Sequence, residues 1–197
     1  MTTLKVQKRD METKAKRLRR NGYVTGNLFG KEFEGSIPLK IEKQEAERIA
    51  RECPKGSQLY VDLDGKQYDV LMKELDYDSM TRQIIEMDFQ ALVKGEKVHS
   101  VAEIVLHNKE MVTEGVLEQL LEEVSYKATP DAIVSKVDID CGKLKLGDSV
   151  KVGDLDMAKD KNVDIHTPLD TTIVRVIASH NDCLLYTSDA ADDTPCV

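Results

Sequence analysis

The stretch QLYVDLDGKQYDVLM, residues 58–72, limits the possible folds of this chain more than any other part of the sequence. On each side of the pair Asp64-Gly65, apolar residues alternate with polar ones. A period of two is that of a β-strand with one buried face, and Asp-Gly favours the tight turn of a two-residue hairpin. The stretch therefore predicts a β-hairpin, and the fold must contain a sheet.

Short apolar segments follow one another along most of the chain, separated by Gly, Pro and Asp. One helix is expected at 42–52, because EKQEAERIARE is rich in good helix formers and is followed by Pro54. These patterns together predict a mainly β protein. Besides the hairpin, strands are expected at 4–10, 22–30, 31–41, 82–93, 98–107, 129–140, 143–155, 162–168 and 171–179.

A polar, glycine-containing hinge at 94–97 divides these segments into two groups. The first group, 1–93, predicts a small β-barrel with one or two short helices. The second group, 94–182, predicts a mostly β domain, although the apolar spacing of GVLEQLLEEVSY (115–126) favours a helix when taken alone. Residues 183–197 do not fit the pattern, and we expect them to be a non-native extension or a disordered native tail.

Charge is distributed unevenly along the chain. The formal net charge is -8, yet residues 1–93 hold 17 Lys/Arg against 16 Asp/Glu, whereas 94–197 hold 11 against 20. The first twenty residues alone contain 8 basic and 2 acidic side chains. This asymmetry predicts that the N-terminal part meets a polyanion, while the acidic part stays solvated or contacts protein.

The sequence contains no pattern typical of an enzyme or a cofactor site. The four histidines are scattered, the four cysteines form no CxxC pair, and no glycine-rich phosphate loop occurs. Cys53 and Cys141 are expected to be buried thiols. Because no apolar run could cross a bilayer and the N-terminus lacks a secretory core, we expect a cytosolic, non-catalytic protein. We expect no cofactor, metal, small-molecule substrate or membrane partner.

Five cations lie within KAKRLRR, residues 14–20, which we expect to form a loop or one irregular turn. Each phosphate neutralised by Lys or Arg releases condensed counterions, so a few such contacts can dominate affinity for nucleic acid. Arg adds a planar fork that can contact phosphate or a base edge at two points. The block therefore indicates RNA binding, and a solvated charged loop is the alternative that it leaves open.

Longer stretches resemble a known family. KAKRLRRNGYVTGNLFG (14–30) is similar to the opening of the bacterial ribosomal proteins that bind 5S rRNA, the twenty-fifth of the large subunit, and IEMDF (85–89) resembles their acidic-aromatic strand end. GVLEQLLEEV, ATPDAI and VDIDCGKLKLGDSVKVGDL resemble the added C-terminal β domain of the longer members, the general stress protein CTC type. The resemblance covers roughly 4–180.

The resemblance implies a 5S-rRNA-binding β-barrel followed by a C-terminal β domain, with 115–124 as a strand. It implies a ribosome-associated protein whose partners are 5S rRNA and neighbouring large-subunit proteins. Asp88 could accept hydrogen bonds from RNA or could cap local backbone amides, and Phe29 and Phe89 are expected to pack in the core more than to stack on bases. The residues expected to contact RNA are Arg9, Lys14, Lys16, Arg17, Arg19, Arg20, Phe29, Lys73 and Asp88.

Some positions depart from the pattern of that family. Phe29 stands where a tyrosine is common, and Lys73 and Asp76 correspond to two glutamines that commonly face the RNA. Glu86 replaces a histidine, while Asp88 is retained. Carboxylates near phosphates reduce affinity, so these departures favour an alternative function, that of a stress-related ribosome-associated or protein-interaction factor with weakened RNA binding.

Overall fold

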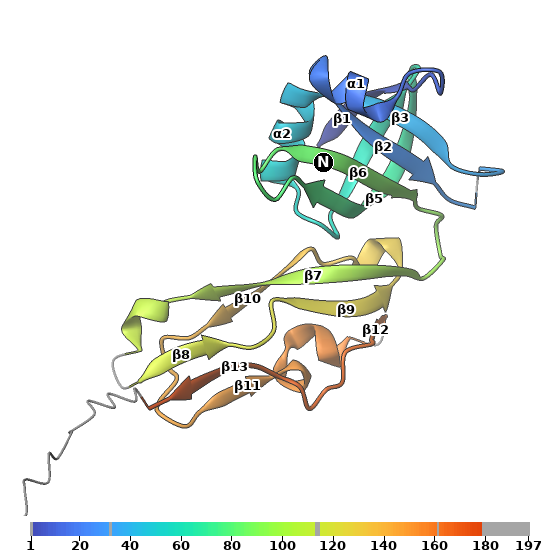
Figure 1. The fold of residues 1–197 in the computed structure, drawn as a ribbon. Helices are drawn as coiled ribbons and strands as arrows, with labels where there is room; N and C mark the ends of the chain where they lie inside the picture. Colours follow the sequence, from blue (N-terminus) through green and yellow to red (C-terminus); the bar gives the residue numbers. More distant parts are fainter. Residues whose placement is uncertain (1, 32, 113–114, 161, 179–197) are drawn as a thin grey trace, which may run out of the picture.

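The computed structural model describes residues 2–178 except 32, 113, 114 and 161. It confirms the mainly β fold with a small barrel followed by further β structure (Figure 1). The expected tail at 183–197 lies outside the described residues. The elements up to residue 93 are β1 (Thr3–Lys8), α1 (Ala15–Arg20), β2 (Tyr23–Phe29), β3 (Ile37–Glu42), α2 (Lys43–Glu52), β4 (Gln58–Leu63), β5 (Lys66–Tyr77) and β6 (Ile84–Ala91).

The first six strands form a closed barrel in the order β1-β3-β2-β6-β5-β4. The predicted hairpin is confirmed: β4 and β5 pair antiparallel around Asp64 and Gly65, which both have positive φ as the tight turn requires. Two parallel contacts, β1 with β4 and β2 with β6, complete the ring. At the β2–β6 contact, a side chain on Gly26 would collide with the carbonyl oxygen of Met87, so only glycine allows this approach.

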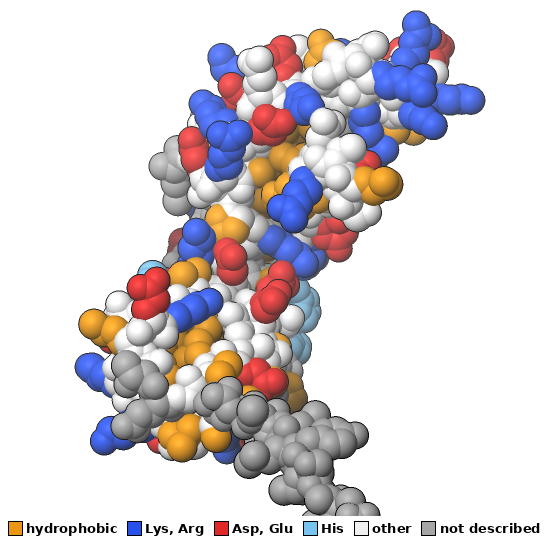
Figure 2. Space-filling view, turned by 60° about the vertical axis from the view of Figure 1, so that its left-hand side comes forward, with side chains coloured by type: hydrophobic (Ala, Val, Ile, Leu, Met, Phe, Trp, Pro, Cys, Tyr) orange, Lys and Arg blue, Asp and Glu red, His pale blue; other side chains and the backbone are white. Residues whose placement is uncertain are grey.

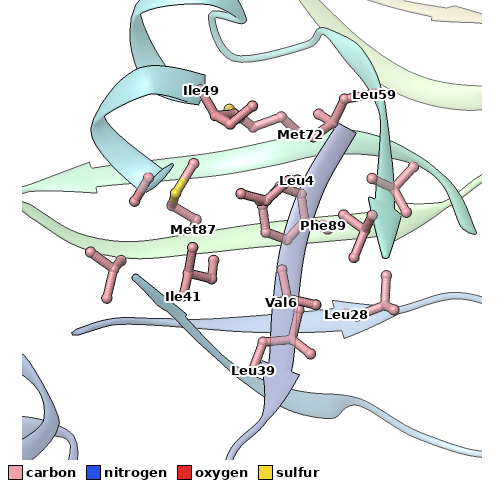
Figure 3. Packing of buried hydrophobic residues seen from close by; sticks show 14 of the residues in the cluster. Leu4, Val6, Leu28, Leu39, Ile41, Ile49, Leu59, Met72, Met87 and Phe89 are labelled. Carbon is pink, nitrogen blue, oxygen red and sulfur yellow. The ribbon is translucent and has the colours of Figure 1, made fainter. Parts of the chain in front are cut away.

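The barrel interior is filled by the inward side chains of the alternating strands (Figure 3). Leu4, Met87 and Phe89 are fully buried there, which confirms the core placement expected for Phe89. Helix α2 is confirmed as well, and it contributes Ala46 and Ile49 to the same core. A continuous apolar interior makes the barrel wall a rigid support for whatever lies on its outer face.

The second part of the chain packs two small sheets against each other, one ordered β10-β7-β9-β12 and the other β11-β13-β8. Their core includes the fully buried Tyr126 and Ile173. The elements are β7 (Val98–His107), β8 (Val116–Gln119), β9 (Glu123–Ala128), β10 (Lys136–Asp140), β11 (Ser149–Lys151), β12 (Val163–Ile165) and β13 (Thr172–Ile177), with short 3₁₀ turns η1 (Lys109–Met111), η2 (Pro130–Ala132), η3 (Val152–Asp154) and η4 (Asp156–Lys159).

The segment with helical spacing, 115–126, forms strands, as the family resemblance implied. It forms β8 and β9, which belong to different sheets, with a break between them. The backbone N–H groups of Leu120 and Leu121 both donate to the carbonyl oxygen of Ile173 at this break. The apolar residues of this segment do not share one buried face, since Val124 is buried whereas Val116 and Leu120 are exposed.

The barrel and the second part meet through a small apolar cluster of Leu71, Leu92 and Val98, with Ile133 packed against it. Polar contacts surround this cluster. Lys55 pairs with Glu123 at 3.7 Å. The apolar cluster joins β5 to the start of β7, and the ion pair joins the segment after α2 to β9. The domain limits 1–93, 94–182 and 183–197 stay a prediction.

The close approach of β2 to β6 at Gly26 can be tested by substitution. We expect Gly26→Ala to lower the free energy of unfolding by about 1–3 kcal/mol, because the new methyl group forces β2 away from β6. Urea denaturation of the full chain would measure this loss.

Gly35→Ala is the matched control, since a side chain there meets no atom within 4 Å. Its effect should stay within about 0.5 kcal/mol. An equal loss for both variants would mean that the close approach does not hold the barrel together.

Candidate nucleic-acid interface

The basic block forms a helix, which corrects the expected loop or irregular turn. Its residues are good helix formers, and one apolar side chain, Leu18, is buried against the barrel. Three of its arginines lie in the last turn, where cations interact favourably with the helix dipole. Gly22, with φ +83°, ends the helix and donates its N–H to the carbonyl of Arg19. The helix thus forms because one apolar residue anchors it while the cations face solvent.

Arg19 fixes this helix to the closing contact of the barrel. Its Nε donates to the carbonyl oxygen of Ile85, and its Nη2 donates to the hydroxyl oxygen of Thr25, both at 3.2 Å. The Thr25 hydroxyl in turn donates to the same carbonyl. Arg19 therefore spans β2 and β6. Thr25 lies only six residues from it along the chain, whereas Ile85 lies 66 residues away, and no sequence pattern relates either one to Arg19.

The remaining cations of the block, Lys14, Lys16, Arg17 and Arg20, are exposed. Within the described part of the chain, none of their side chains takes part in a hydrogen bond or ion pair. Figure 2 shows Lys and Arg side chains gathered at the end of the barrel that lies away from the second part. Lys16, Arg17 and Arg20 lie on α1, and Lys14 directly precedes it. Because their side chains bond to no described residue, these four cations form a surface suited to phosphate groups.

Arg9 does not belong to that exposed group. It is half-buried, its Nη2 donates to the carbonyl oxygen of Thr13 at 3.0 Å, and its backbone N–H donates to the carbonyl of Pro38. These bonds shape the turn that leads from β1 into α1. Arg9 therefore helps to hold the turn before α1, and it does not belong to the group of exposed cations.

The barrel wall beside α1 carries carboxylates instead of cations. Asn27, which the sequence reasoning did not single out, donates its side-chain amide to Glu86 at 3.2 Å and to Asp88 at 3.0 Å. Its backbone N–H also donates to Asp88, at 3.1 Å. The carboxylate of Asp88 thus accepts from a backbone amide of the neighbouring strand β2, 61 residues away along the chain, and its contact with RNA stays a prediction. Asp76 pairs with Glu86 across the β5–β6 ladder, so two acidic residues adjoin there.

The structure does not bring Lys73 and Phe29 together with the basic helix. Lys73 donates from Nζ to the carbonyl oxygen of His99 at 2.8 Å, and desolvation lowers its pKa. Lys73 therefore forms a hydrogen bond between the barrel and the second part of the chain. Phe29 is half-buried at the far end of β2, where it lines a hollow of about 350 Å³ with Phe33.

Comparison with known proteins identifies the chain. The model of the Ribosomal L25p family matches residues 4–89, and that of the ribosomal protein TL5 C-terminal domain matches 97–180. A large ribosomal subunit protein bL25 of Exiguobacterium sibiricum is 30% identical over 165 residues, which are 82% of this chain and 73% of that protein. The chain belongs to the bL25 family.

Other bL25 proteins show the same extent of similarity. That of Halothermothrix orenii is 30% identical over 83% of this chain and 75% of its own length, and that of Listeria monocytogenes is 29% identical over 81% and 78%. Family membership makes the chain a structural constituent of the large ribosomal subunit and not an enzyme. It confirms the resemblance drawn from the sequence and the expected association with the ribosome.

The remaining candidate groups show no catalytic arrangement. His99 and His166 lie far apart in the sequence, yet their rings lie 4.7 Å apart between β7 and the residues after β12. Among the described residues, no group of three or more His, Cys, Asp or Glu could hold a metal ion. Cys53 and Cys141 are buried free thiols, as predicted. No described helix is long and apolar enough to cross a membrane.

The bonds of Arg19 generate a second test. We expect Arg19→Ala to speed hydrogen exchange of the α1 amides, for example that of Asn21, by about fivefold or more, because the helix loses its polar link to the barrel. Exchange measured by NMR on the full chain would report it.

Arg20→Ala is the matched control, since the neighbouring Arg20 makes no side-chain hydrogen bond to a described residue. Its α1 amides should exchange as in the unaltered protein. Equal acceleration in both variants would show that Arg19 does not fix the helix.

Proposed function

We propose that this chain binds 5S rRNA and that α1 supplies the main contact. The single observation that carries the proposal is a set of four exposed cations at a helix fixed to a rigid wall: Lys16, Arg17 and Arg20 lie on α1, and Lys14 is the residue that precedes it. Family membership supports the large ribosomal subunit as the place where this contact is made.

The geometry favours folded RNA because the cations lie beside a barrel wall and not on a free tail. RNA helices present a wide, shallow minor groove and two lines of phosphates. A short helix with cations on one face can contact phosphates while the wall beside it meets sugar hydroxyls. Arg19 and Arg9 position the helix and the turn before it. Lys73 does not take part in the RNA contact, because its side chain is bonded to the carbonyl oxygen of His99.

The neighbouring carboxylates limit how the RNA can lie. Glu86 and Asp88 each accept a hydrogen bond from the side-chain amide of Asn27, and both have further acceptor capacity. A phosphate beside them would be repelled, whereas a base amino group or a ribose hydroxyl could donate to them. We therefore place phosphates over α1 and hydroxyl or amino groups over β6.

The salt dependence of binding tests the role of α1. We expect the affinity of the full chain for 5S rRNA to fall steeply with salt, and Arg17→Ala to reduce the slope of log affinity against log salt by about one unit. Filter binding across a potassium chloride series would measure both slopes.

Arg51→Ala is the matched control, because Arg51 is an exposed arginine in the last turn of the other helix of the barrel. Its slope should equal that of the unaltered chain. The proposal fails if Arg17→Ala leaves the slope unchanged, or if transfer RNA, another small folded RNA, binds as tightly as 5S rRNA.

A second function is favoured by the carboxylates of the wall: a ribosome-associated or protein-interaction factor whose RNA affinity is weak. Asp76 and Glu86 stand where the family pattern commonly has glutamine and histidine, and the retained Asp88 is a third carboxylate beside them. If they weaken binding, Glu86→Gln should raise the affinity for 5S rRNA several-fold at low salt, since it removes a charge and keeps an acceptor for Asn27.

The same filter-binding assay decides between the two functions. Under the second function, the unaltered chain binds 5S rRNA no more tightly than transfer RNA, and Glu86→Gln restores the preference. Under the first, the unaltered chain already prefers 5S rRNA.

A further inference from the structure

A groove runs along one edge of the second part of the chain. The strand β10 (Lys136–Asp140) is the outermost of its sheet and pairs only with β7 (Figure 1). All five of its residues line a hollow of about 630 Å³, and the opposite wall is formed by residues of the segment 150–160. At about 3.3 Å per residue, β10 is long enough to face an extended peptide of about five residues.

The outward edge of β10 has unpaired backbone groups. The carbonyl of Ser135 accepts from the N–H of Glu103, and the N–H of Cys141 donates to the carbonyl of His107. In a parallel strand, alternate residues direct both backbone groups to the same neighbour. The N–H and C=O groups of Lys136, Asp138 and Asp140 therefore face away from β7, and they have no backbone partner among the described residues.

The groove combines an apolar floor with an acidic rim. Ile139, Leu155 and Met157 are buried apolar residues that contribute to the floor. Five aspartates and one lysine stand around it, so the lining is strongly negative. The aspartates are Asp138, Asp140, Asp154, Asp156 and Asp160.

Local partners contact some of these carboxylates. Asp138 pairs with His107 at 2.8 Å, and Asp156 pairs with the exposed Lys159 at 3.0 Å. Asp140 accepts from the side-chain amide of Asn108 and from a backbone amide, and these hydrogen bonds lower its pKa. The rim thus places five carboxyl groups beside an unpaired strand edge.

We propose that this groove binds an extended, basic segment of another protein, which adds to β10 as a strand. The occupant would alternate apolar side chains, which enter the floor, with Lys or Arg side chains, which face the aspartates. Added strands gain affinity from main-chain hydrogen bonds and specificity from alternate side chains.

The charges argue against the other candidate occupants. Residues 181–197 of this chain contain four Asp and neither Lys nor Arg, so the same aspartates would repel them. A second copy pairing through β10 would bring Asp138 and Asp140 of both copies to one seam. RNA would be repelled for the same reason. Only a cationic peptide matches both the edge and its rim.

The test uses the full chain and a synthetic peptide of nine residues that alternates valine and lysine, labelled for fluorescence anisotropy. We expect saturable binding that weakens with salt. A peptide in which glutamate replaces lysine should not bind, and one N-methylated at every valine and lysine, which has no backbone N–H left to donate to β10, should bind at least tenfold more weakly.

Variants of Asp138 separate the backbone from the charge. Asp138→Asn removes a carboxylate and should weaken binding about threefold, whereas Asp138→Pro also removes an outward N–H and should weaken it at least tenfold. Asp131→Asn, at an exposed aspartate outside the groove, should change nothing.

The proposal is overturned if the glutamate peptide binds as well as the lysine peptide, or if N-methylation has no effect. If Asp131→Asn and Asp138→Asn bind the lysine peptide equally well, the affinity would come from the overall negative charge of the protein and not from the groove, and this outcome would also overturn the proposal. The N-methylated peptide keeps the test decisive even if Asp138→Pro fails to fold, because it leaves the protein unaltered.

Discussion

The parallel contact between β2 and β6 closes the barrel, and the proposed RNA interface depends on it. Gly26 permits this contact because any side chain at that position would meet the carbonyl oxygen of Met87. Closing the ring places the Ile85 carbonyl and the Thr25 hydroxyl side by side, and Arg19 binds both. A backbone constraint inside the barrel thus determines where a cationic helix is held on its outside.

The distribution of charge explains how an acidic chain can bind a polyanion. The formal net charge of -8 arises mainly from residues 94–197. Figure 1 shows α1 at the end of the barrel that is opposite the second part. Because charges are screened over about 8 Å at physiological ionic strength, phosphates at α1 respond to the local cations. The acidic part is then free to meet a partner of the opposite charge.

Local patterns predicted much of the fold, whereas contacts between distant residues could not be predicted. The hairpin at 58–72 and helix α2 depend on neighbouring residues, and both are confirmed. The basic block was predicted as a loop because Leu18 gains its buried place only from the folded barrel. The acceptors of Arg19 and the bond of Lys73 to His99 join residues that no sequence pattern relates. The list of candidate cations could therefore be drawn from the sequence, but their division into exposed and structural ones could not.

The most direct test of the account is lysine footprinting of the full chain with and without 5S rRNA. Acetylation followed by mass spectrometry reports the accessibility of each lysine separately. If α1 is the contact, saturating RNA protects Lys14 and Lys16, while Lys143 and Lys145 of the second part react as in the free protein. Unchanged reactivity of Lys14 and Lys16 in a saturated complex, with protection elsewhere, would contradict the account.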